Sequence, residues 1–308
     1  MAALTRCPYS TDVLDGTEPE NEEHIVPVAL GAPLSFTVRA KAAKNSEMNA
    51  LVDAPAIHDP ILRMVAMAQG VESRSGAVSA QLDGIVEGSG QAVRIHLSSE
   101  SVGFKFRNPV ERDITSGAVT GVYGFGDDAQ NLADQVVRDS VRKGKQVVLG
   151  EVESTQPEVQ ARAPMNLHIV RRELTKIAYL MMVRVFGDEA ILSPGGATYR
   201  AAMLAPTMDA FKATGIRGST FQQLPPGMPR PGASQHALVC VRLGDQIVSA
   251  VSLFGTFNAL FSSSADGFSV EEGSGEVVVI EVATSRLSSY SYLSVVTDLI
   301  QTGLPRQA

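Results

Sequence analysis

The run MNLHIVRRELTKIAYLMMVRVFG, residues 165–187, is the segment that most restricts how this chain can fold. Its apolar residues recur at the three- and four-residue spacing of one helix face, and Gly187 is suited to end the helix. The residues on this stripe are Leu167, Val170, Leu174, Ile177, Leu180 and Met181. We therefore expect this helix to form the centre of the core in the second half of the chain.

Four short apolar segments follow this helix, separated by residues typical of turns. They are ALVCVRL (237–243), QIVSAVSLFG (246–255), FNALFSS (257–263) and EVVVIEV (276–282). Strand patterns at this spacing favour an antiparallel meander. Residues 161–308 are thus predicted to form a region of helix plus antiparallel sheet.

The N-terminal part of the chain has the order strand, strand, helix. HIVPVAL (24–30) has the pattern of a strand, GAP that of a turn, and LSFTVRA (34–40) that of a second strand. Met48, Leu51 and Val52 then recur at helical spacing, which predicts a helix over about residues 42–53. We expect a hairpin followed by this helix within a module at 1–62.

The middle of the chain, residues 63–160, is predicted to mix strands with one helix. Strands are expected at 91–98, 102–107 and 145–154. The helix expected at about 127–143 has aspartates in its first turn and basic residues in its last, which suits the helix dipole at both ends. Together the three regions predict an α+β fold.

The composition limits where the chain works and what it binds. The net charge is −7 and the pI is about 5.3, which argues against a stand-alone, high-affinity nucleic-acid binder. No apolar run is long and uncharged enough to predict a transmembrane helix. Cys7 and Cys240 are too few for a disulfide framework, and no secretion signal is apparent, so we expect free thiols in the cytoplasm.

The charge is unevenly distributed near the N-terminus. Residues 12–23 contain six acids and no basic residue, whereas Arg39, Lys41 and Lys44 follow without an intervening acid. An acidic stretch beside a basic one suits a divalent metal next to a phosphate, but it equally suits a solvated loop and a solvated helix start. Charge alone leaves both interpretations open.

Four residues in this region form a pattern with a chemical meaning. Glu23 and His24 are neighbours on the first predicted strand, and Asn45 and Asn49 lie four residues apart on the predicted helix. One-metal nucleases of the ββα type need a divalent ion on the scissile phosphate and a neutral imidazole that takes a proton from water. Glu23 with the two asparagines could hold the ion, and His24 could act as the base.

The run EEHIVPVALGAPLSF, followed by KAAKNSEMNALVDAPAIHDPIL, resembles the HNH endonuclease family. In that family a Glu-His or Asp-His pair opens the motif and an asparagine stands at the head of the helix some twenty residues later. The resemblance covers residues 7–62. RRELTKIAYLMMVRVFGD and the VSLFG segment resemble parts of larger bacterial and phage proteins that carry this domain.

The resemblance implies a function and a set of site residues. It implies hydrolysis of DNA phosphodiester bonds with His24 as general base and a divalent ion, Mg²⁺ or Mn²⁺, held by Glu23, Asn45 and Asn49. The residues implied to hold the phosphates of the DNA are Arg39, Lys41 and Lys44. An acidic nuclease could also need a second protomer or a basic protein partner to hold its substrate.

The chain departs from the family pattern in two places. Many relatives carry two Cys-x-x-Cys pairs on a structural zinc, whereas here Cys7 is followed by Ser10, and Lys41 and Lys44 stand at the second pair. Four thiolates cannot be assembled, so no structural zinc is expected. The asparagine usual between the two strands is also missing. The alternative function is therefore a catalytically degenerate protein that keeps the HNH fold for binding or structure.

The remaining histidines carry no catalytic expectation. His58 follows a proline break and is expected to be a capping or interdomain residue. His96, His168 and His236 stand alone in strand or helix patterns, where most histidines are structural.

Overall fold

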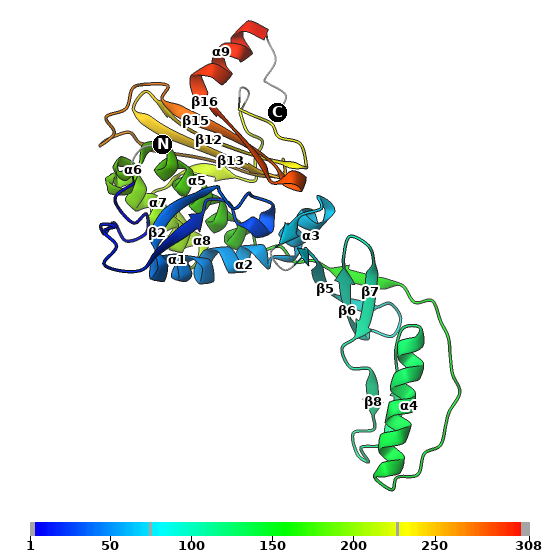
Figure 1. Ribbon diagram of the computed structural model, residues 1–308. Coiled ribbons are helices and arrows are strands. Elements are labelled where there is room, and N and C mark those ends of the chain that lie inside the picture. The colour runs from blue at the N-terminus through cyan, green and yellow to red at the C-terminus, as the bar shows by residue number, and fades with distance from the viewer. Residues whose placement is uncertain (1–3, 74–75, 226–227, 303–308) are drawn as a thin grey trace. The chain divides into compact units, whose positions relative to one another are not determined.

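The computed structural model describes residues 4–73, 76–225 and 228–302, and it divides the chain into two compact units (Figure 1). One unit contains the described residues up to Val78 and from Met165 onward, and the other is Ser79–Pro164. The N-terminal segment expected at 1–62 therefore belongs to the same unit as the long helix and the C-terminal strands. Mixed helices and antiparallel sheets confirm the α+β class.

The N-terminal residues form an antiparallel hairpin followed directly by a helix. Strand β1 (Glu20–His24) pairs with β2 (Thr37–Lys41), and α1 (Ala42–Met48) begins at the next residue. The helical stretch continues through η2 (Asn49–Asp53), one π-helical turn, into α2 (Ala54–Ile57). The order strand, strand, helix thus holds in the structure.

The first strand was predicted over 24–30 and is in fact β1, which ends at His24. The ladder continues only to the bond that Ile25 N–H donates to Phe36, because Pro27 has no N–H to donate. The short helix η1 (Val28–Leu30) follows, and Gly31 ends it with φ of +92°. At Gly31 a Cβ would lie 2.6 Å from the Val282 side chain, so only glycine fits this turn.

A six-stranded antiparallel sheet dominates this unit. Its strand order is β11-β14-β13-β12-β15-β16. The strands are β11 (Arg217–Thr220), β12 (Gln235–Leu243), β13 (Gln246–Leu253), β14 (Phe257–Ser264), β15 (Gly275–Glu281) and β16 (Arg286–Ser291). Strands β12, β13 and β14 form the predicted meander, but β15 joins the free edge of β12 instead of continuing beyond β14. The predicted meander of four strands was therefore wrong at its last strand.

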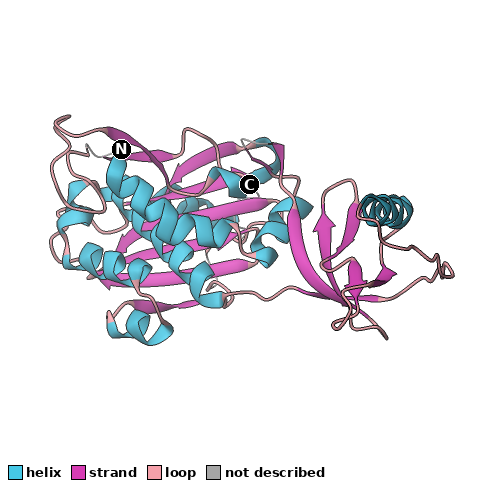
Figure 2. Ribbon diagram, turned by 90° about the horizontal axis from the view of Figure 1, so that it is seen from below, coloured by secondary structure: helices cyan, strands magenta, loops and turns pink. Residues whose placement is uncertain are grey.

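The helix α5 (Leu167–Phe186) packs on one face of this sheet together with neighbouring helices (Figure 2). Those helices are α6 (Asp188–Leu192), α7 (Pro194–Leu204) and α8 (Met208–Ala213). Most of α5 is buried on all sides rather than along one stripe, and Leu167, predicted on that stripe, is exposed. The buried residues of α5 include Glu173 and Lys176, two charged groups in the middle of an apolar core.

The other elements of this unit lie around that core. Asp59 caps α3 (Pro60–Ala68) and also accepts a hydrogen bond from the Asn166 N–H before α5, which joins the N-terminal helices to the core helix. Strands β3 (Glu72–Ser73) and β4 (Gly76–Ala77) form a short pair. On the other face of the large sheet, Leu224 and residues of α9 (Tyr292–Thr302) cover a smaller apolar cluster.

The second unit contains a four-stranded sheet of order β10-β5-β6-β7, a separate hairpin and one helix. The elements are β5 (Ala80–Val86), β6 (Ala92–Leu97), β7 (Val102–Phe106), β8 (Val110–Arg112), β9 (Val119–Val122), α4 (Asp127–Arg142) and β10 (Val159–Arg162). The prediction of a strand over residues 145–154 was wrong, because these residues form no strand. The strand that pairs with β5 is instead β10.

None of the helices in the described ranges combines the length and the apolar character needed to cross a membrane.

Candidate functional site

Glu23 and His24 lie on opposite faces of β1, because successive side chains of a strand point to opposite sides of the sheet. Glu23 lies opposite Val38 and is only 2% exposed, whereas His24 lies opposite Thr37 and is half-buried. Glu23 therefore points into the protein and His24 points toward the other side of the hairpin. The two residues predicted to share one reaction centre are separated by the strand itself.

The Glu23 carboxylate is held by two internal partners. Its Oε1 atom accepts a hydrogen bond of 2.7 Å from the Tyr9 hydroxyl and lies 2.8 Å from Lys176 Nζ. Lys176 Nζ also lies 2.6 Å from Asp53 Oδ1 at the end of the π-helical turn. The Lys176 ammonium, on α5, thus joins β1 to the helical stretch that follows the hairpin.

Glu173, one turn before Lys176 on α5, completes this cluster. Burial raises the pKa of Glu173 well above its ordinary value, and the Asp53 carboxylate beside it raises this pKa further. A raised pKa favours the neutral carboxyl form of Glu173 beside the Asp53 carboxylate. We call Tyr9, Glu23, Asp53, Glu173 and Lys176 the buried charge cluster.

The electrostatics of the buried charge cluster favour a charged lysine. Burial by itself would lower the pKa of Lys176, but the acidic groups around it, Asp53 above all, outweigh burial and raise it. Burial also raises the pKa of Glu23, and the nearby Lys176 ammonium opposes that shift. An ammonium without exposed surface needs such partners, because an unpaired buried charge costs several kcal/mol.

Asn45, predicted as a metal ligand, connects α1 to the hairpin. Its Nδ2 atom donates to Asn21 Oδ1 over 2.9 Å and to the Glu22 backbone carbonyl over 3.2 Å. Asn49, the second predicted asparagine, is exposed, and its side chain makes no hydrogen bond to another described residue. The structure therefore brings Asn45 close to β1 but does not join it to the Glu23 carboxylate through a hydrogen bond.

The three basic residues predicted to hold DNA all have acidic partners. Arg39 pairs with Glu20 across the hairpin. Lys41 Nζ lies 3.0 Å from Glu18 Oε2, and Lys44 Nζ lies 2.8 Å from Glu47 Oε2. Ion pairs at the protein surface contribute about 0–1 kcal/mol, so a phosphate could displace them. The acids near these three cations, Asp12, Asp15, Glu18, Glu20, Glu22 and Glu47, outnumber them, so this part of the chain is acidic.

The residues around Glu23 do not fit the divalent ion that the sequence pattern implies. A hard cation needs several free oxygen ligands, but Glu23 Oε1 already accepts from Tyr9 and faces the Lys176 ammonium. Over the residues that the structure describes, no three His, Cys, Asp or Glu side chains are placed to hold a metal together. The fixed ammonium occupies the position beside the carboxylates where a cation would bind.

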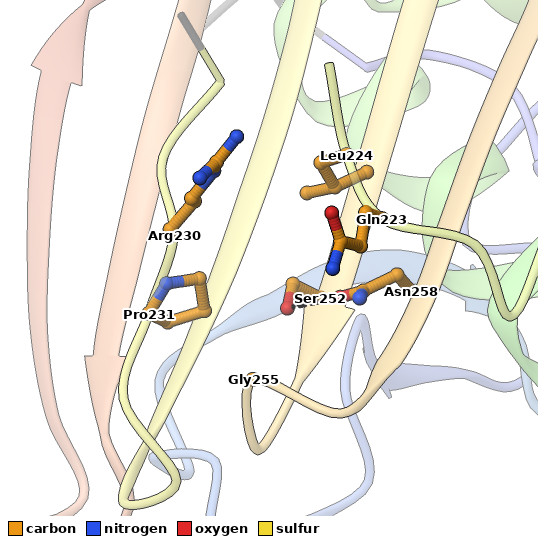
Figure 3. A pocket seen from close by; sticks show the side chains of 7 residues that line it. All are labelled: Gln223, Leu224, Arg230, Pro231, Ser252, Gly255 and Asn258. Carbon is orange, nitrogen blue, oxygen red and sulfur yellow. Dashed lines mark hydrogen bonds between the residues drawn. The ribbon is translucent and has the colours of Figure 1, made fainter. Parts of the chain in front are cut away.

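A small cavity lies on the face of the large sheet opposite α5 (Figure 3). Its volume is about 210 Å³, and its lining includes Gln223, Arg230, Ser252 and Asn258. Ser252 Oγ donates to Asn258 Oδ1 over 2.6 Å, so these two groups satisfy each other within the wall. The cavity includes no residue of the hairpin or of the buried charge cluster.

The sequence pattern found Glu23 but missed the residues that surround it. Tyr9, Asp53 and the α5 pair of Glu173 and Lys176 come from three separate segments, so no local spacing connects the three segments to one another or to Glu23. One signal was present, because Glu173 and Lys176 interrupt the most apolar helix of the chain. Charged residues within such a helix are expected to be paired when buried.

Comparisons with known proteins add no family to these observations: no family model, no curated protein and no solved structure matches the chain.

Proposed function

We propose that this chain is a non-cleaving protein that keeps an HNH-like ββα unit and acts by binding DNA. The observation that carries the proposal is the position of Lys176 Nζ, 2.8 Å from Glu23 Oε1 and 2.6 Å from Asp53 Oδ1. A metal-dependent cut would require the Glu23 carboxylate to hold a divalent ion. In this protein an internal ammonium already neutralises that carboxylate.

The retained Glu-His-Asn pattern has a partial explanation without catalysis. Glu23 supports the buried lysine, and Asn45 fastens α1 to β1 through Asn21 and the Glu22 carbonyl. Both residues therefore contribute to holding the ββα unit together. A degenerate member of the family could keep them for that reason alone.

The second candidate is the endonuclease implied by the sequence resemblance, and the position of His24 favours it. His24 ends β1 on the face opposite Glu23 and is half-buried, so its ring has some access to solvent. In that role the imidazole would take a proton from the attacking water. Because Glu23 is engaged by Lys176, no step is assigned to a metal ion.

A plasmid assay separates the two candidates. Supercoiled DNA is incubated with the full chain and Mg²⁺ or Mn²⁺, and nicking is compared with a chelator control. We expect no nicking above that control for the wild type. Metal-dependent nicking that falls about 100-fold or more in His24→Ala would overturn the proposal and establish the endonuclease, since a general base contributes at least this factor.

A further inference from the structure

The four-stranded sheet of the second unit presents a polar face to solvent. Buried residues of β5 and β6 alternate with exposed or half-buried ones, and Leu82, Val93 and Ile95 are among the buried residues. Phe104 and Phe106 of β7 pair with Ile95 and Val93 and so lie on the buried side. The opposite side chains of the same strands therefore point outward.

Four charged residues on the outward side lie in one row across the sheet. Arg162 of β10 pairs with Asp83 of β5, Asp83 with Arg94 of β6, and Arg94 with Lys105 of β7. Residues paired directly across antiparallel strands point to the same side of a sheet. Neighbouring strands are about 4.8 Å apart, so the row spans about 14 Å. We call Arg94, Lys105 and Arg162 the basic row.

The basic row is not neutralised by neighbouring acids. Asp83, which lies between Arg162 and Arg94 in the strand register, forms its ion pair with Arg107, which follows β7. Within the described part of the chain, no carboxylate forms an ion pair with Arg94, Lys105 or Arg162. This contrasts with Arg39, Lys41 and Lys44 of the hairpin, each of which has an acidic partner. All three residues of the basic row are exposed.

We infer that the basic row is a docking surface for the phosphate backbone of duplex DNA. Its charge is opposite to that of phosphate, although the whole chain carries a net charge of −7. Guanidinium groups match phosphate oxygens in geometry, and lysine supplies a point charge. The inference rests on the proposed function for its choice of DNA as the polyanion.

The position of the aromatic residues favours duplex over single-stranded DNA. A single-strand platform stacks bases on exposed aromatic rings. Here Phe106 stacks on Phe125 at 4.6 Å between ring centroids, and both Phe104 and Phe106 lie on the side opposite the basic row. The outward side also has few apolar side chains, with half-buried Ile85 near the end of β5, so it is unsuited to insertion into a lipid layer.

The test is DNA binding by the full chain carrying Arg94→Gln, Lys105→Gln and Arg162→Gln together. A short fluorescein-labelled duplex is titrated with protein in the presence of a chelator, from about 50 to about 200 mM salt. Each lost phosphate contact lowers the slope of log affinity against log salt by about 0.9. We expect the slope to fall by about 2 to 3 and the affinity at low salt to fall about tenfold or more.

The matched control removes the same amount of charge elsewhere. Lys212, Arg217 and Arg286 are exposed cations of the other unit, and their combined glutamine variant is expected to keep most of the wild-type affinity and slope. Equal binding by the wild type and the basic-row variant, equal losses in the two variants, or no binding by the wild type would overturn the inference. Far-UV circular dichroism of each variant verifies that the sheet remains folded.

The outcome is separable from that of the plasmid assay. Metal-dependent nicking with a basic-row variant that no longer binds duplex would refute the non-cleaving function and leave the docking surface standing. Absence of nicking together with unchanged binding by the basic-row variant would refute the docking surface alone. A His24→Ala chain is expected to bind the duplex as the wild type does.

Discussion

Replacing Lys176 with methionine is expected to lower the free energy of unfolding by about 3–5 kcal/mol. Methionine has a similar length but no charge, so the Glu23 and Asp53 carboxylates would lose the ammonium that lies within 3 Å of both. Removing one partner of a buried ion pair leaves an uncompensated charge in a medium of low polarity. Urea denaturation followed by far-UV circular dichroism measures this loss at neutral pH.

A rescue variant separates the charge effect from a simple packing defect. Adding Glu23→Gln and Asp53→Asn to Lys176→Met removes the stranded charges, and most of the lost stability should return. The control is Lys212→Met on α8, where an exposed side chain is replaced and a change within about 0.5 kcal/mol is expected. A loss below about 1 kcal/mol for Lys176→Met would mean that the buried charge cluster does not hold β1, the π-helical turn and α5 together.

The buried charge cluster also shows why the site was harder to predict than the fold. Helix α4 was predicted from local signals, because the aspartates of its first turn and Arg142 near its end suit the helix dipole. Lys176 stands out locally as a charge within an apolar helix, but nothing in the local sequence shows which acids it meets. Asp53 and Lys176 are 123 positions apart, and only the packing of α5 against the N-terminal helices brings them together.

Two errors in the predicted strands have the same physical origin. Residues 145–154 have the alternation of a strand but find no neighbour, whereas β10 forms because Val159 and Gln160 pair with Val86 and Ile85. Strand β15 has the local pattern of a meander strand, yet it pairs with β12 across a long connection. A strand is stabilised by its neighbours, so the choice of neighbour is a property of the whole fold.

His236 connects the large sheet to the N-terminal segment and is a neutral, buried residue. The Phe254 N–H donates to His236 Nδ1 over 3.1 Å, so Nε2 carries the proton and donates to the Leu30 carbonyl over 2.7 Å. Burial lowers the pKa of His236 to about 4. Protonation would place a second N–H against the Phe254 amide, so the charged form disrupts this connection.

The wild-type protein should therefore lose stability in mild acid. The variant His236→Gln should lack this His236-dependent loss. An unfolded histidine takes up its proton near pH 6.5, whereas folded His236 resists protonation down to about pH 4. The stabilising contribution is therefore complete above pH 6.5 and is lost as pH falls toward 4. The size of the shift corresponds to about 3 kcal/mol.

The measurement compares wild type with His236→Gln by urea denaturation between about pH 7.5 and about pH 4. Glutamine can accept from Phe254 and donate to Leu30 without titrating, so the difference in unfolding free energy between the two proteins isolates His236. Glu23 and Glu173, whose raised pKa values favour folding at low pH, are present in both proteins and cancel. We expect the advantage of the wild type to fall by about 3 kcal/mol across this range. A difference between wild type and His236→Gln that stays constant with pH would show that His236 takes up its proton equally well in the folded and unfolded chain.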